Sequence, residues 1–180
     1  CDAADTAYDG QVIKAVKAIG TPPVNGSISG ENIWDHAYRG NLAWNTGADE
    51  VEGLSAYFKT LFSSDSLYVF VSVTDPEVVD EDEVGICIDL GTEKSIDIGW
   101  EGDPTDEDGF LFSKITVGEG SKISRGVVYG VETTNDGYNV EMGIAWADIT
   151  TEQSLIDNAM TSGEFWIDFG IKNNGEGSQV

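Results

Sequence analysis

Two apolar runs joined by a short polar turn constrain the fold more than any other part of the sequence. Residues 55–62 alternate loosely between apolar and polar side chains, a Ser-Ser-Asp-Ser turn follows, and residues 67–73 are rich in β-branched and aromatic side chains. This pattern predicts a β-hairpin. Asp75-Pro76 ends the second run, because proline has no N–H to give to a strand ladder. Residues 84–89 alternate again and form a third predicted strand.

The remaining sequence favours the same structural class. The chain has 180 residues, a length typical of one domain, and 22 glycines break it into short alternating segments. Only residues 151–160 have a helical spacing. We therefore predict an all-β protein, an antiparallel, jelly-roll-like β-sandwich of about nine strands with one short helix near 151–160. Residues 1–19 are expected to form a tail and an edge strand, and residues 20–180 the sandwich.

The charge balance excludes one class of partner. Nine Lys and Arg residues stand against 33 Asp and Glu residues, which gives a formal net charge of −24. Nucleic acid is excluded, because its binding requires a basic surface. A compact fold with this much like charge repels itself unless salt or bound cations offset it. Both a salt-adapted acidic surface and cation binding are consistent with the composition.

The acidic residues gather in two loops that could hold Ca²⁺. Residues 80–83 are all acidic, and residues 101–108 hold five acidic side chains on a backbone bent by glycine and proline. Calcium takes six to eight oxygen ligands, which such loops can supply, although neither has EF-hand spacing. Solvated acidic loops are the alternative. The candidate ligands are Asp75, Asp80, Asp82, Asp89, Asp103, Asp106 and Asp108.

The sequence offers few residues suited to catalysis. It has one histidine, His36, and two cysteines far apart, so neither a nucleophile with its base nor a zinc site is indicated. A pair of carboxylates is expected by chance among so many acidic residues and carries no specificity. We predict that the protein is not an enzyme.

Four segments carry short motifs in a fixed order. They are residues 20–34, with Gly-Thr-Pro and Ile-Trp; residues 67–89, with Leu-Tyr-Val, Asp-Pro and Ile-Asp; residues 137–146, with Gly-Tyr and Val-Glu; and residues 165–174. Together they resemble the core signature of the family 9 carbohydrate-binding modules, which are DOMON-like sandwiches. The resemblance implies a non-catalytic antiparallel β-sandwich, structural calcium, and a sugar slot between two tryptophans.

The sugar slot itself departs from the family pattern. Val79 stands at the position of the second slot tryptophan, and Gly85 at that of an expected glutamate. The resemblance assigns Trp34 to the slot, and a plug in the core is the alternative for this side chain. Trp44 and Trp100 are the candidates to replace the missing partner.

A second departure suggests a different function. The chain ends before the closing C-terminal strand of the family, and an open sheet edge pairs readily with another chain. The N-terminal edge strand could be donated to a neighbour, through Gln11, Val12, Ile13, Ala15 and Ile19. Our leading hypothesis is a secreted structural subunit that self-assembles with copies of itself into a filament or tube, with calcium bridging acidic loops.

Two alternatives remain open. One is a cell-surface carbohydrate-binding module whose partner is a polysaccharide. The other is a haem-binding DOMON-type domain with axial ligands drawn from His36, Met142 and Met160.

The cysteines bear on where the protein works. Cys1 is followed by small and acidic residues, as in a processed lipoprotein whose thiol carries the lipid. The alternative is that processing or cloning left it there. Cys87 lies in the third predicted strand, where a cysteine is usually a small buried hydrophobe. An extracellular or cell-surface protein is expected.

Overall fold

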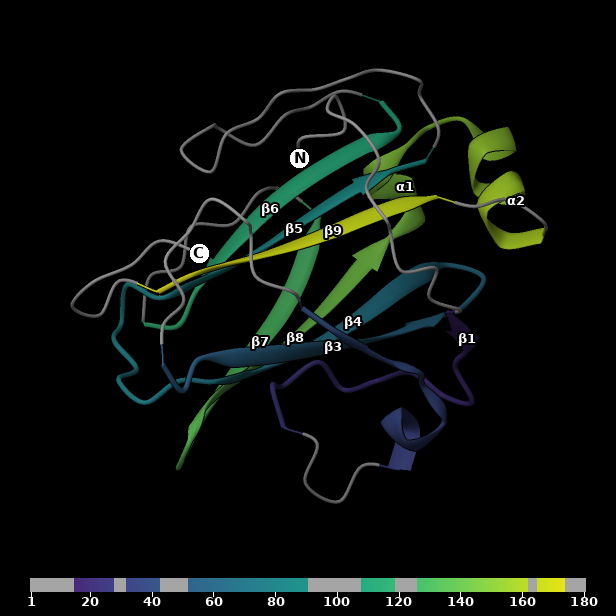
Figure 1. The fold of residues 1–180 in the computed structure, drawn as a ribbon. Coiled ribbons are helices and arrows are strands. Elements are labelled where there is room, and N and C mark those ends of the chain that lie inside the picture. Colours follow the sequence, from purple (N-terminus) through teal and green to yellow (C-terminus); the bar gives the residue numbers. More distant parts are fainter. Residues whose placement is uncertain are drawn as a thin grey trace.

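The computed structural model describes residues 15–27, 32–42, 52–90, 108–118, 126–161 and 165–173. These residues form two sheets packed face to face (Figure 1). The predicted all-β sandwich is confirmed. The strands are β1 (Val16–Lys17), β2 (Arg39–Asn41), β3 (Ser55–Phe62), β4 (Ser66–Thr74), β5 (Glu83–Asp89), β6 (Phe110–Thr116), β7 (Val127–Thr134), β8 (Gly137–Ala145) and β9 (Trp166–Lys172), and the helices are η1 (Asn32–His36), α1 (Trp146–Ile149) and α2 (Gln153–Thr161).

The larger sheet has the order β1-β3-β4-β8-β7, with β2 also paired to β3, and the smaller sheet has the order β6-β5-β9. All strand pairs in the described residues are antiparallel except β1 with β3. The small sheet draws its three strands from the middle and the end of the sequence. The sandwich therefore depends on long-range pairing.

The predicted hairpin is β3 and β4, paired from Ser55 opposite Thr74 to Phe62 opposite Leu67. The Ser63 hydroxyl oxygen closes the turn by accepting hydrogen bonds from the backbone N–H groups of Asp65 and Ser66. A serine side chain that replaces a backbone acceptor in this way is a common turn device. The polar run between the two apolar runs therefore has a structural role.

The alternation of β4 buries both of its faces. Leu67, Val69, Val71 and Val73 belong to the core between the two sheets. Tyr68 and Phe70 point to the opposite face, where they form an outer cluster with Leu61 and Trp34. Figure 1 shows η1 lying against this outer face, on the side of the large sheet away from the small sheet. The large sheet is thus covered on both sides along β4.

The N-terminal segment pairs with its own chain where it is described. Val16 and Lys17 of β1 lie beside Leu61 and Phe62 of β3, which is shorter pairing than a strand over residues 11–19 would give. Among the predicted assembly residues, Ala15 is half-buried and Ile19 is 76% exposed. Gln11, Val12 and Ile13 lie outside the described residues, so strand donation stays a prediction.

Cys87 lies on the outer face of the small sheet, in a cluster with Phe110 and Phe112. It is buried, as predicted, and it is also disulfide-bonded. Cys87 therefore has a covalent role in addition to its packing.

None of the described helices is long and apolar enough to cross a membrane.

Candidate functional site

Trp34, the tryptophan that the family resemblance assigns to the sugar slot, is a core residue in this structure. Its side chain is 2% exposed, and its ring centroid lies 5.7 Å from that of Phe70. The indole Nε1–H donates a hydrogen bond of 2.6 Å to Glu141 Oε1. A ring enclosed in this way offers no open face for a sugar, so the geometry fits the plug interpretation.

Glu141 is the partner that fixes Trp34. The sequence analysis quoted it within the Val-Glu motif of residues 137–146 and assigned it no role. Its side chain is 0% exposed, and Oε2 accepts hydrogen bonds from the backbone N–H groups of Asn25, at 2.7 Å, and Gly26, at 2.9 Å. Three N–H donors compensate the burial of one carboxylate, as a buried charge requires. The 25–26 turn and η1 are therefore tied to the same side chain of β8.

The turn that Glu141 holds packs closely on the edge of β7. A Cβ atom added to Gly130 would lie 2.3 Å from the backbone carbonyl carbon of Asn25. Gly26 has a φ of +82°, a conformation that side chains rarely adopt. Gly26 and Gly130 are thus required by backbone geometry and close approach.

A second buried polar group lies at one end of the sandwich and is called here the acidic corner: Asp75 after β4, Asp82 before β5, and Tyr138 in β8. All three residues are buried. Asp75 Oδ1 accepts the backbone N–H of Glu77, and Asp82 Oδ2 accepts that of Val79. Among the described residues, Asp75 Oδ2 and the Tyr138 hydroxyl are buried and have no hydrogen-bond partner. Burial raises the pKa of Tyr138, and the Asp82 and Asp75 carboxylates raise it further, so the phenol stays protonated.

The acidic corner fits a hard cation in part. It supplies oxygen atoms only, which is the donor set that Ca²⁺ prefers, and a cation would satisfy the orphaned Asp75 Oδ2. Its two carboxylates are fewer than the three or more His, Cys, Asp or Glu residues of a complete cluster, and no such cluster occurs among the described residues. Carbonyl groups or water would have to complete the coordination. Asp80 lies next to this corner, where its carbonyl accepts the N–H of Gly118.

The other predicted calcium ligands do not join this corner. Asp89 is at the far end of β5, about 20 Å away by the rise of an extended strand. Asp108 accepts hydrogen bonds from the backbone N–H and the hydroxyl of Thr151 near the start of α2. Asp103 and Asp106 lie outside the described residues. The seven candidates therefore do not form one site.

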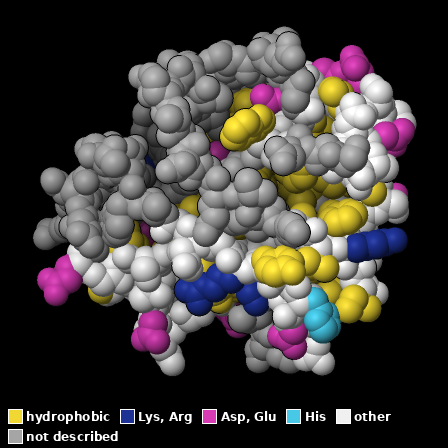
Figure 2. All heavy atoms as spheres, turned by 45° about the vertical axis from the view of Figure 1, so that its right-hand side comes forward, with side chains coloured by type: hydrophobic (Ala, Val, Ile, Leu, Met, Phe, Trp, Pro, Cys, Tyr) yellow, Lys and Arg dark blue, Asp and Glu magenta, His cyan; other side chains and the backbone are white. Residues whose placement is uncertain are grey.

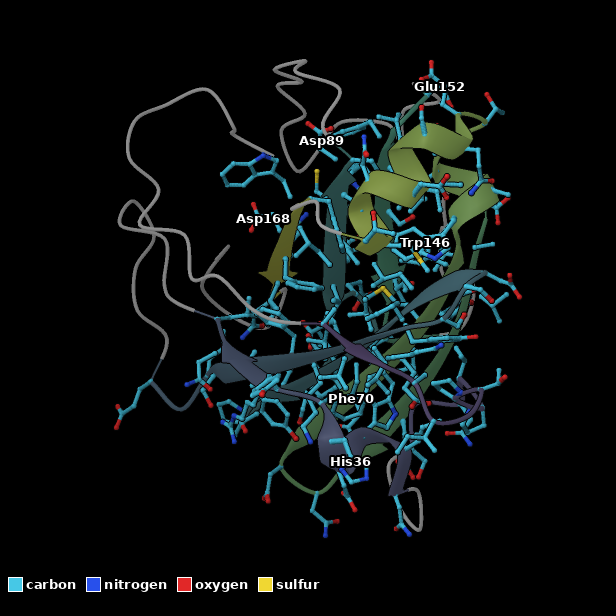
Figure 3. The ribbon with its side chains drawn as sticks, turned by 90° about the vertical axis from the view of Figure 1, so that its right-hand side faces the viewer. His36, Phe70, Asp89, Trp146, Glu152 and Asp168 are labelled. Carbon is cyan, nitrogen blue, oxygen red and sulfur yellow. The ribbon has the colours of Figure 1, made fainter. Side chains whose placement is uncertain are left out.

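An exposed tryptophan that the sequence analysis did not single out lies on the small sheet. Trp166 opens β9 and is 69% exposed, with Asp89 of β5 directly opposite and Asp168 two residues further along. Figure 3 shows Asp89 and Asp168 together at the end of the molecule opposite Phe70 and His36. The alternation of this strand could have predicted the exposure of Trp166. Ile167 and Phe169 face inward, so Trp166 and Asp168 face outward. Trp44 and Trp100 lie outside the described residues.

A cationic and aromatic surface lies on the opposite sheet. The Arg39 guanidinium is 4.0 Å from the centre of the Tyr57 ring, and its Nε donates a hydrogen bond to Asn41 Oδ1. Lys59, opposite Arg39 in the pairing of β2 with β3, donates to the Trp34 carbonyl. Figure 2 shows Lys and Arg side chains beside hydrophobic ones on the face that carries the histidine. These contacts brace η1 and β2 against β3.

The family's slot and a haem site are both poorly supported by the described residues. Val79 is half-buried at the acidic corner, so no aromatic wall stands there. His36 is exposed beside the outer cluster, whereas Met142 lies in the core between the sheets, and Met160 of α2 packs against that core. A histidine and a methionine on opposite faces of one sheet cannot ligate the same haem iron.

Comparisons with known proteins agree with this architecture. The family profile described as "Carbohydrate family 9 binding domain-like" matches residues 24–167. A carbohydrate-binding module of family 9 from Caldicellulosiruptor kristjanssonii, solved in complex with glucose, has a TM-score of 0.62 and 16% identity, over 90% of this chain and 78% of that one. The same module with cellotriose gives 0.62 and 16%, over 88% and 76%. No curated protein matches.

The structural likeness supports the fold, and the profile match spans well over half of the chain. The match begins at the turn held by Glu141 and ends in β9, so it includes both sheets. The chain therefore belongs to the carbohydrate family 9 binding domain-like family.

Proposed function

We propose that this protein is a non-catalytic carbohydrate-binding module. The observation that carries the proposal is the family match over residues 24–167 on a two-sheet sandwich. The structural relatives from Caldicellulosiruptor kristjanssonii were solved with glucose and cellotriose, which makes a soluble or insoluble glucan the first ligand to test.

A structural Ca²⁺ at the acidic corner is part of this proposal. Two buried carboxylates at the junction of the sheets repel each other, and Asp75 Oδ2 has no hydrogen-bond partner within the described part of the chain. A cation there would offset this repulsion and join the end of β4 to the start of β5. Its role would be to stabilise the sandwich.

The site of action is proposed to be extracellular or at the cell surface, where a polysaccharide ligand is met. The hypothesis of a self-assembling filament has weaker support, because the described part of the N-terminal segment pairs within its own chain. It stays a prediction, and light scattering with calcium and then with chelator tests it.

Affinity electrophoresis through gels that contain single soluble polysaccharides tests the proposed function. We expect retardation by at least one neutral glucan, and co-sedimentation with cellulose if the ligand is insoluble. Bovine serum albumin, which is also acidic, serves as the control for retardation by charge or viscosity. Migration equal to the control in every neutral and charged polysaccharide would contradict the proposal.

A further inference from the structure

The outer face of the small sheet carries an indole flanked by two carboxylates. Trp166 and Asp89 are directly opposite each other in the antiparallel pairing of β9 with β5, which brings their Cβ atoms to roughly 5 Å. Asp168 shares the face of Trp166, since residues two apart on a strand point the same way. These three residues are called the tryptophan platform.

The packing of β9 in the sandwich does not depend on the Trp166 side chain. Ile167, Phe169 and Ile171 point into the core, and the Phe169 ring lies 4.3 Å from the Phe58 ring of the large sheet. The fold thus gains its packing from the other face of β9. The Trp166 indole is 69% exposed on this fixed strand, and tryptophan is enriched at binding interfaces because its ring is apolar and its N–H is polar.

The chemistry of the platform selects its ligand. An indole face packs well against the C–H face of a pyranose ring, and carboxylate oxygens accept hydrogen bonds from sugar hydroxyls. Asp168 Oδ1 accepts the backbone N–H of Phe169, which fixes the orientation of its side chain. Two neighbouring negative charges repel an anionic chain, so uronic acid polymers are disfavoured.

We propose that the tryptophan platform binds a hexopyranose unit of a neutral glucan, with Trp166 as the stacking surface and Asp89 and Asp168 as hydroxyl acceptors. The inference rests on the proposed function and gives it a location. This location differs from the two-tryptophan slot that the family resemblance implies, because Val79 and the acidic corner lie at the other end of β5.

Isothermal titration of the full chain with cellohexaose, after a screen of neutral glucans, tests the platform. We expect Trp166→Ala to weaken binding roughly tenfold or more, the loss of one aromatic stacking contact. Tyr38→Ala is the matched control, since Tyr38 is an aromatic residue of similar exposure at β2 of the other sheet. Both variants should retain the melting temperature of the wild type, because both side chains are exposed.

A charge-changing variant tests the selectivity. Asp168→Asn keeps an oxygen acceptor and removes a negative charge, so we expect it to bind carboxymethylated cellulose more tightly than the wild type does while binding cellohexaose within about threefold. If the affinity of Trp166→Ala for cellohexaose stays within about twofold of the wild-type affinity, the platform is wrong and the proposed function still stands. A wild type that binds no glycan in the screen would overturn both.

Discussion

Trp34 and Trp166 are both tryptophans beside carboxylates, and their surroundings differ completely. Trp34 donates its indole N–H to the buried Glu141 and is enclosed by the outer cluster of the large sheet. Trp166 stands exposed on the small sheet between Asp89 and Asp168. The first indole is buried, whereas the second is exposed beside the buried cluster of Cys87, Phe110 and Phe112 on the same sheet. The motif position of a tryptophan therefore does not show whether its ring is open to a ligand, and its burial does.

The largest expected effect is the difference in stability between the alanine variants of Trp34 and Trp166. Trp34→Ala should lower the free energy of unfolding by about 3–5 kcal/mol, because it opens a cavity in the outer cluster and leaves Glu141 Oε1 without its indole donor. Trp166→Ala should change it by only about 0.5 kcal/mol or less. Urea unfolding followed by circular dichroism measures both. Equal losses in the two variants would break the comparison.

Glu141→Gln should cost about 2–3 kcal/mol, since the amide keeps the shape of the side chain but loses charge-assisted bonds to three N–H donors. Hydrogen exchange should show faster exchange at Asn25 and Gly26 and little change in β9. Glu132→Gln, on the neighbouring and partly exposed β7, is the isosteric control. Unchanged protection at the 25–26 turn would mean that Glu141 does not hold it.

The acidic corner should respond to calcium by a smaller amount. Saturating Ca²⁺ should stabilise the wild type by about 1–3 kcal/mol, as expected for a ligand that binds only the folded state. Asp75→Asn should abolish most of this gain, whereas Asp108→Asn, in a solvent-facing hydrogen bond to Thr151, should keep it. Thermal unfolding with calcium and with chelator gives the measurement. Stabilisation that is identical in wild type and Asp75→Asn would place the cation elsewhere.

A small effect on stability is expected at the cationic and aromatic surface. Arg39→Ala should lower stability by about 0.5–1 kcal/mol, the value of an exposed cation–π contact with Tyr57. It should leave glycan affinity unchanged, because the tryptophan platform lies on the other sheet. A loss of glycan affinity in Arg39→Ala would move the binding surface from β9 to β2.

Local pattern was sufficient to predict most of the fold. The alternation of residues 55–62 and 67–73 gave β3 and β4 almost to the residue, and the helical spacing of residues 151–160 gave α2. The sandwich followed from many short strands together with the family resemblance. The individual strands and the helix depend on neighbours in the sequence, where propensity and periodicity act directly.

The site was predicted less well because it depends on contacts between distant residues. Glu141 meets Trp34 across 107 positions, and no local pattern marks a carboxylate that becomes buried. The acidic residues could be chosen by type, but only the pairing of strands shows that Asp75 and Asp82 share one end of the sandwich and Asp89 lies at the other. The alternation of β9 was sufficient to predict an outward-facing Trp166, but the family resemblance assigned Trp34 to the sugar slot instead.

The disulfide at Cys87 bears on the compartment in which this protein works. Disulfides persist in oxidising compartments and are rare in reducing ones, which agrees with the proposed extracellular site of action. The Cys87 sulfur lies beside the buried Phe110 and Phe112 rings, so little of it is accessible to a reductant.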